Sequence, residues 1–274
     1  MAKLTRKLWI GIGAATIAGA PVATGVVAQE PAHKGHQPPA ADSAKASDTA
    51  APGGEAYLTD GGPRDTRIRF YRDIELMRGH LLIGDQLIAL GLWDEAVPHF
   101  LHPTEELYDL MERYIKLHSI PPFRRDLQAL AQTVKAKREG AYRQSLKVVH
   151  GRLDAALGVA KKFMTPNHRF TVKSAVEVLR VAHSEYEASL ENGKFTKPVE
   201  YQDSRGFVWQ AERMIEGAAR KLASLDKEAL QRVRADLARL KTAWPTPMPP
   251  DAPVLEPGQV SAIISDIELQ IPRY

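Results

Sequence analysis

The sequence predicts an all-α protein, an antiparallel bundle of several helices, on three observations. Apolar residues recur at steps of three and four along most of the chain from Asp65 onward. No stretch shows the apolar–polar alternation of a half-buried strand. The breaks between the periodic segments are short, which favours antiparallel packing of consecutive helices. We also expect a disordered N-terminal leader and a C-terminal helix that docks on the bundle.

The N-terminus has the features of a secretory signal. Three basic residues precede an apolar run from Leu8 to Ala28, which is rich in Gly and Ala and ends in small residues suited to signal peptidase. We therefore expect a signal peptide over residues 1–28. The alternative is an uncleaved anchor, because this run is close to the ~20 residues that span a bilayer.

The 274-residue chain contains no cysteine, which excludes a lipoprotein anchor, disulfides, thiolate metal ligands and covalently attached haem. An exported chain of this kind is expected in the periplasm of a Gram-negative bacterium, without a membrane span after cleavage. Losing the three positive charges of the signal reduces the net charge from +4 to about +1. The sequence pI of 9.2 therefore does not indicate a nucleic-acid partner.

The chain after the signal divides into three predicted parts. Residues 29–63 are rich in Ala, Pro, Ser and Gly, and with few aliphatic residues they are expected to form a flexible leader. Residues 64–242 are the predicted helical bundle. Residues 243–274 combine a proline-rich linker with a short helix, whose apolar side should dock on the bundle because exposed it would be an apolar patch.

Two helices open the bundle. Residues 65–90 carry two adjacent apolar stripes, as expected for a helix packed on two sides. A second helix over 93–115 contains Pro98 and Pro103, which lack a backbone donor and predict a kink around residues 99–104. Further helices are expected over 123–139, with Gly140 only bending the chain, and over 142–163, 172–190, 201–223 and 226–240, the last capped by Asp226.

The turn between the first two helices resembles a tetratricopeptide hairpin. Gly84 and Ala96 are small residues where the helices should approach, and Phe100 is an aromatic residue after the turn. A repeat of about 34 residues should place a further small residue at position 118, which is His118. We therefore expect one tight hairpin and no array of repeats.

The hairpin brings candidate metal ligands together. His80 lies eleven residues before Gly91 and His102 eleven after it, so the two side chains should lie at the same level. Glu105 and Glu106 follow His102 by three and four positions, on the same helix face. His80, His102 and Glu106 could converge on a metal ion, with Glu105 as the alternative to Glu106. His99, about one turn nearer the turn of the hairpin, is a weaker candidate.

A second polar group could complete this ligand set from the other side of a four-helix arrangement. His183 lies beside an apolar stripe and is expected to point inward, followed by Glu187 at the next turn. Glu200 and Asp203 lie near the start of the following helix. Of this group, His183 is the predicted ligand.

Readings without a metal remain open for each of these residues. His183 could be a buried, hydrogen-bonded neutral imidazole. Asp203 could cap its helix or pair with Arg205. Glu105 and Glu106 could simply occupy a helix start, where acidic side chains are favourable.

Imidazoles and carboxylates without thiolates suit iron, zinc, manganese or copper(II). The chain has no serine nucleophile elbow, no phosphate-binding glycine loop and no HExxH motif, so we expect no enzymatic activity. The leading hypothesis is an exported protein that binds a divalent metal ion in uptake or homeostasis, with another periplasmic protein as a further partner. The alternative is a structural or protein-interaction module without metal. A metalloenzyme would also require an open coordination position.

An exported, cysteine-free helical bundle with histidine–glutamate pairs resembles the imelysin-like proteins, which carry a Gly-x-His-x-x-Glu signature. His102 and Glu105 match the His-x-x-Glu part, but Phe100 stands where the glycine should be. Gly79 and His80 are adjacent, which is the wrong spacing. The resemblance covers the architecture of residues 65–240 and implies a role with a divalent metal, iron above all, in which His102 and Glu105 would be ligands.

Overall fold

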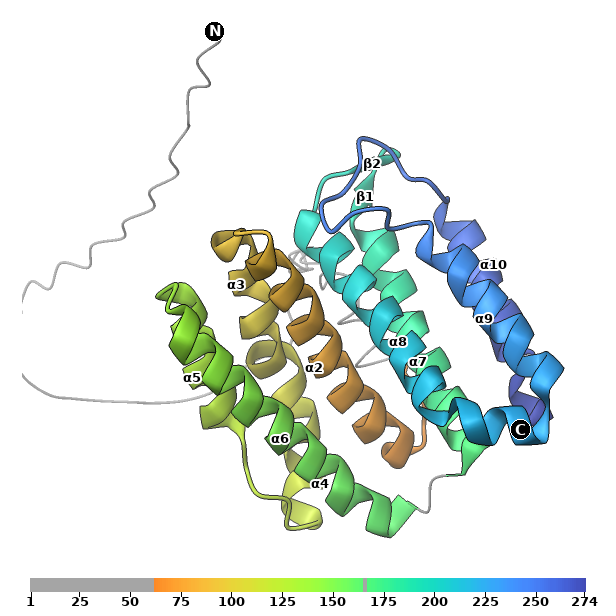
Figure 1. The fold of residues 1–274 in the computed structure, drawn as a ribbon, viewed down its shortest axis with the longest axis horizontal. Coiled ribbons are helices and arrows are strands. Elements are labelled where there is room, and N and C mark those ends of the chain that lie inside the picture. Colours follow the sequence, from red (N-terminus) through yellow and green to blue (C-terminus); the bar gives the residue numbers. More distant parts are fainter. Residues whose placement is uncertain (1–61, 165–166) are drawn as a thin grey trace, which may run out of the picture. The chain divides into compact units, whose positions relative to one another are not determined.

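The computed structural model describes residues 62–164 and 167–274, which lie in one compact unit that runs from Thr49 to Tyr274. The predicted signal peptide, and the predicted leader up to residue 61, lie outside the described residues. Within the described part, all secondary-structure elements are helices apart from one short strand pair (Figure 1). The all-α prediction is therefore confirmed.

The elements follow the chain in this order: α2 (Thr66–Ala89), α3 (Trp93–His102), the π-helical turn η2 (Pro103–Leu107), α4 (Tyr108–Leu117), α5 (Arg124–Lys135), α6 (Glu139–Met164), α7 (His168–Ala188), β1 (Leu190–Glu191), β2 (Lys194–Phe195), α8 (Pro198–Leu225), α9 (Lys227–Lys241), α10 (Pro257–Glu268) and the 3₁₀ turn η3 (Ile271–Arg273).

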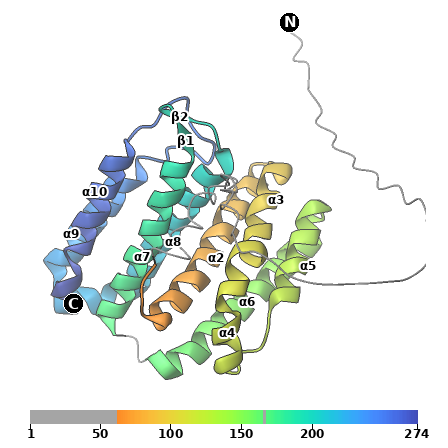
Figure 2. The same cartoon turned by 180° about the vertical axis from the view of Figure 1, so that it is seen from behind.

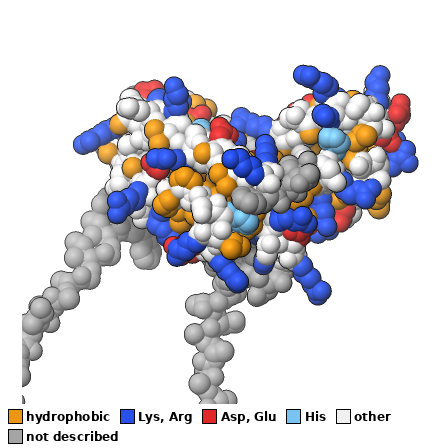
Figure 3. Space-filling model, turned by 90° about the horizontal axis from the view of Figure 1, so that it is seen from below, with side chains coloured by type: hydrophobic (Ala, Val, Ile, Leu, Met, Phe, Trp, Pro, Cys, Tyr) orange, Lys and Arg blue, Asp and Glu red, His pale blue; other side chains and the backbone are white. Residues whose placement is uncertain are grey.

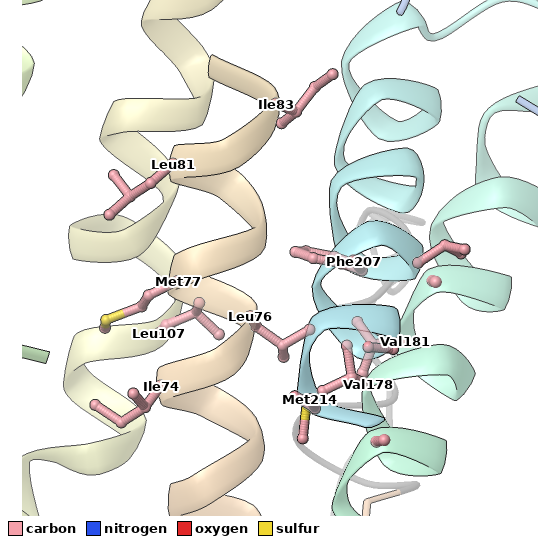
Figure 4. Packing of buried hydrophobic residues seen from close by; sticks show 14 of the residues in the cluster. Ile74, Leu76, Met77, Leu81, Ile83, Leu107, Val178, Val181, Phe207 and Met214 are labelled. Atoms are coloured by element: carbon pink, nitrogen blue, oxygen red, sulfur yellow. The ribbon is translucent and has the colours of Figure 1, made fainter. Parts of the chain in front are cut away.

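Helix α2 is the central element, because it packs against α3 and α6 as well as α7 and α8. Its apolar side chains point to two sides of the helix. In Figure 4, Leu76 points toward α8, whereas Met77 and Leu81 point to the opposite side. All three are at most 1% exposed, which confirms the broad apolar face predicted for this helix.

The predicted hairpin joins α2 to α3. Gly91 has φ +79°, a conformation that glycine adopts without strain, and the Leu92 N–H donates to the Leu87 carbonyl at 2.9 Å to close the end of α2. A Cβ atom on Gly84 would lie 2.5 Å from Phe100 Cε2. The small residue and the aromatic ring thus meet where the hairpin resemblance placed them.

Three local features differ from the predicted pattern. The chain breaks between α5 and α6 at residues 136–138, where Lys137 has φ +53°, and does not merely bend at Gly140. Helix α8 begins at Pro198, which is well suited to a first helical turn, and so starts three residues earlier than expected. The strands β1 and β2 form an antiparallel pair. With two residues each, they are too short to show an apolar–polar alternation in the sequence.

The C-terminal half forms a group of four packed helices, α7 to α10 (Figures 1 and 2). The Asp226 side chain accepts from the Ala229 N–H at 2.8 Å, which confirms the predicted cap of α9. Helix α10 packs on α7 and α9 and buries the following residues: Val260, Ile263, Ile264 and Ile267. The predicted docking of the terminal helix is therefore confirmed. Among the described helices, none is both long enough and apolar enough to cross a membrane.

Candidate metal centre

Two glycines set the position of the site, where α2 crosses α8. A Cβ atom on Gly79 would lie 2.6 Å from Phe207 Cδ1, and one on Gly206 would overlap the carbonyl oxygen of Gly79. The two backbones can approach this closely only because both residues lack a side chain. The crossing places His80, next to Gly79, against Asp203, three residues before Gly206.

The carboxylate of Asp203 is the centre of a histidine cluster. His80 Nδ1 lies 2.6 Å and His99 Nδ1 2.7 Å from Asp203 Oδ1, and His102 Nδ1 lies 3.0 Å from Oδ2. His80, His99 and Asp203 are 3% exposed or less, whereas the His102 side chain is 21% exposed. Three of the four side chains of the cluster are thus buried, and only His102 is partly exposed to solvent.

The hydrogen-bond pattern fixes where the protons lie. An ionised carboxylate can only accept, so each of the three imidazoles donates from Nδ1 to Asp203. His99 Nε2 lies 3.0 Å from Gln202 Oε1, while the Gln202 amide nitrogen lies 3.3 Å from Met248 Sδ. Both ring nitrogens of His99 therefore lie against oxygen atoms, one of Asp203 and one of Gln202.

Burial and charge shift the pKa values within the cluster in different directions. Burial opposes ionisation of Asp203, but the neighbouring His80 and His99 and the hydrogen bonds from His102 and His80 outweigh it and hold the Asp203 pKa well below 3.8. Burial lowers the pKa of His80, which favours a neutral ring with a free lone pair at Nε2.

For His102, burial is again the largest influence and opposes protonation. The hydrogen bond and the charge of Asp203, with further contributions from Glu106 and Glu185, act the other way and together raise the His102 pKa to about 9. His102 therefore carries a positive charge at neutral pH. A metal ion that binds to it must displace a proton.

A π-helical turn lies directly after His102. Tyr108 N–H bonds to the Pro103 carbonyl across this wider turn, and Pro103 has no N–H to continue the ladder of α3. The turn places Glu106 Oε1 3.5 Å from His102 Nδ1. Single π turns inside helical segments are frequent at functional sites. The change to π geometry at η2 overlaps the predicted kink at Pro103 and Thr104, whereas α3 stays regular up to His102.

The structure brings together some of the predicted ligands and separates others. His80 and His102 lie side by side, with ring centroids 5.3 Å apart, and Glu106 is next to His102. Glu105 is exposed on the other side of the turn. His183 does not point inward: it is half-buried, and its Nε2 lies 3.1 Å from the Pro257 carbonyl at the start of α10.

The role of Asp203 differs from both metal-free readings of the sequence. It lies well inside α8 and caps no helix, and the Arg205 guanidinium donates instead to Gln86 Oε1 at 2.6 Å. Its carboxylate and the rings of His80 and His102 offer one ligand atom each, all within 4.8 Å of one another. Among the described residues, these three are the group whose atoms are close enough together to hold a metal ion.

Sequence reasoning gave too little weight to Asp203 and His99. The available signal was a run of polar residues at 202–205, directly before Gly206 and within the predicted helix. On the other helix, His80 directly follows Gly79. Each small residue marks a close helix crossing, and the adjacent polar residues are then brought together.

The fold and the site define a helical-bundle protein with a buried histidine–carboxylate cluster. Residues 161–273 match a family model described as the iron permease-associated 4-helix bundle domain. This match covers less than half of the chain and corresponds to α7–α10, with Asp203 inside it and His80, His99 and His102 outside it. No curated protein and no solved structure matches the chain. The bundle architecture fits the imelysin-like resemblance, which itself remains a prediction.

Proposed function

We propose that this protein is exported to the periplasm and binds a divalent metal ion, with iron as its cargo, at His80, His102 and Asp203, in support of iron uptake. It acts without catalysis, in association with a permease. The observation that carries this proposal is the convergence of two imidazoles on one buried carboxylate. The carboxylate belongs to the part of the chain that matches an iron permease-associated domain.

The donor set fits a first-row metal ion. Metal bonds of about 2.1 Å place neighbouring ligands about 3.0–3.5 Å apart. The His80 Nδ1–Oδ1 distance of 2.6 Å is shorter than this range, and the His102 Nδ1–Oδ2 distance of 3.0 Å lies at its lower limit. A small opening of the cluster would admit an ion in place of the protons, with the His80 proton moving to Nε2. Glu106 lies at the solvent side, where it could serve as a fourth ligand. Mixed imidazole and carboxylate donors accept iron, zinc, manganese and copper(II).

The other candidate function is a structural or protein-interaction module. It is favoured by one observation: Asp203 satisfies the Nδ1 of all three histidines by hydrogen bonds alone. In that case the cluster is a buried polar network that fixes how α2, α3 and α8 pack. The hairpin would then serve as a rigid platform for a partner.

Elemental analysis separates the two functions. The mature protein is purified from periplasm without chelator or affinity tag, and its metals are measured by mass spectrometry. Metal binding predicts near-stoichiometric iron or a neighbouring first-row metal, which is lost in the His80→Ala/His102→Ala double variant. The His183→Ala variant is the matched control, because His183 lies outside the cluster and should keep full loading.

Metal binding is contradicted by a metal-free protein that also takes up no added Fe²⁺, Zn²⁺ or Mn²⁺. The assigned site, but not metal binding itself, is contradicted by a double variant that loads as well as the wild type while circular dichroism shows an unchanged helical fold. Periplasmic fractionation of the untagged protein tests the export, and the mass of the mature chain distinguishes a cleaved signal from a retained anchor.

A further inference from the structure

A cavity lies between α2 and α4, away from the candidate metal centre. It has a volume of about 660 Å³, between the first turns of α2 and the last turns of α4. This size lies within the range of about 300–1,000 Å³ that is typical of small-molecule sites. Both helix ends lie at the lower end of the view in Figure 1. None of the residues of the metal centre lines the cavity.

The cavity contains a buried arginine with unused hydrogen-bonding capacity. Arg72 is 1% exposed, and its Nε and Nη2 both lie 2.8 Å from Asp73 Oδ1. Its Nη1 is buried and has no hydrogen-bond partner. A buried donor left unpaired costs more free energy than an ordinary hydrogen bond contributes, so such a group calls for an acceptor.

A second unpaired donor lines the same cavity. The Tyr114 hydroxyl is buried without a hydrogen-bond partner, while its ring stacks on Phe70 with centroids 4.2 Å apart. Two side chains that line the cavity, one from α2 and one from α4, thus each carry an unpaired donor. Both donor atoms are buried, so a ligand oxygen could accept from them only after a small movement of the side chains.

The positive charge around the cavity favours an anionic ligand. Four arginines line it, Arg67, Arg69, Arg72 and Arg113, against a single acidic residue, Asp73. Arg67 pairs with Asp65 outside the lining. The charge of Arg69 acts on Asp73, where it opposes the rise in pKa that burial causes. Arg113 adds a further positive charge to the lining. Arginine is well suited to carboxylate and phosphate because its planar fork matches their oxygens.

Apart from Thr66, Tyr114 and His118, the rest of the lining is apolar, which indicates what the anion is attached to. Leu110 and Leu117 line the cavity and are 45% and 72% exposed. Figure 3 shows the molecule from this end, with hydrophobic side chains among many Lys and Arg side chains. An inorganic ion would leave these leucines in water, whereas an anion with an apolar body would cover them.

We infer that the cavity between α2 and α4 binds a small organic anion, a carboxylate or phosphate group carried on an apolar body. The anionic group accepts from Arg72 Nη1 and the Tyr114 hydroxyl. Arg69 and Arg113 neutralise its charge, and the apolar body lies against Leu110 and Leu117. This site is independent of the metal centre, so each can be present without the other.

Isothermal titration calorimetry of the full-length mature protein with octanoate, octyl phosphate, inorganic phosphate and phosphatidylglycerol vesicles tests this inference. We expect octanoate or octyl phosphate to bind, and inorganic phosphate to bind at least tenfold more weakly. Tyr114→Phe, which keeps the ring and its stacking, should weaken binding about 3- to 10-fold. The Arg69→Gln/Arg113→Gln variant should weaken it further, and more so at low salt.

Arg125→Gln is the control, because this exposed arginine on α5 does not line the cavity and its loss should leave affinity unchanged. The inference is overturned if neither soluble amphiphile binds, or if both bind equally well to the Tyr114→Phe and Arg69→Gln/Arg113→Gln variants. Equal binding of inorganic phosphate would also overturn it in favour of a simple anion site. Binding to vesicles alone would overturn it in favour of a membrane-facing surface.

Discussion

Gly79 in α2 and Gly206 in α8 touch backbone to backbone, and this contact places His80 against Asp203. The two histidines of the hairpin come together through a local turn. The carboxylate that both of them bind is 123 residues from His80 in the sequence and arrives only through the helix crossing. The candidate site thus depends on a packing contact between two residues that carry no side chain.

A methyl group at this crossing should separate the helices. We expect Gly206→Ala to reduce the free energy of unfolding by about 1–3 kcal/mol, as overpacked sites do. The same change should weaken metal binding because His80 moves away from Asp203. Urea unfolding and a metal titration measure the two effects.

Gly217→Ala in the same helix is the matched control, since a Cβ atom there meets nothing within 4 Å. It should stabilise the protein by up to about 1 kcal/mol through helix propensity. Equal effects of the two substitutions would contradict the role assigned to the crossing.

Removing the charge of Asp203 should disrupt the cluster as a whole. Asp203→Asn keeps the shape of the side chain but leaves three imidazole donors around a neutral amide. We expect a loss of about 3–5 kcal/mol in unfolding free energy, as when a buried ion pair loses one partner. The pKa of His102 should fall from about 9, because Asp203 is the main influence that raises it. NMR titration of the histidine ring protons measures this change, and an unchanged value would contradict the assignment.

The stability of the metal-free protein should pass through a maximum near pH 6.5. The His102 pKa is raised, so its contribution is complete below its ordinary value of 6.5 and is lost as the pH rises through about 9. The His80 pKa is lowered, so the unfolded chain binds its proton more readily and stability falls as the pH drops below 6.5. Urea midpoints at pH 5, 6.5 and 9, with chelator present, measure both slopes. In His102→Gln the alkaline slope should disappear, and its persistence would assign that slope to another group.

Between pH 7 and 9, metal affinity should rise with pH, whereas the stability of the metal-free protein should fall. Because His102 is protonated below about 9, each bound ion displaces a proton, and the apparent affinity should rise about tenfold per pH unit from pH 7 toward 9. Calorimetry in two buffers with different ionisation enthalpies counts the released protons. No proton release at pH 7.5 would place the ion elsewhere.

The two glutamates of the π turn can be distinguished by matched substitutions. Glu106 lies 3.5 Å from His102 Nδ1, whereas Glu105 is exposed. Glu106→Gln should weaken metal binding about 10-fold, a typical cost for a residue beside a ligand. Glu105→Gln should leave it unchanged. The reverse order would restore Glu105 as the ligand, as the His-x-x-Glu resemblance implies.

The parts of the site that depend on local geometry could be predicted from the sequence. The distances of His80 and His102 from Gly91 placed the two rings at one level, because a tight helical hairpin fixes its own register. The same reasoning could not reach Asp203. Its position follows from which face of α8 packs on α2, and apolar periodicity does not specify which helices become neighbours.

His183 shows the same limit from the other direction. Its place beside an apolar stripe predicted an inward-pointing side chain, but the ring is half-buried and lies against the start of α10. The break at residues 136–138 was missed for a different reason. Lys137 itself adopts the positive φ, whereas the nearby Gly140 lies inside α6.

The contact between the hairpin and the four-helix segment also divides the site by chemistry. The part of the chain that matches the iron permease-associated family contributes the acid, and the part outside the match contributes the bases. A chain cut down to the four-helix segment would keep the aspartate with no imidazoles around it, so neither part alone contains the cluster.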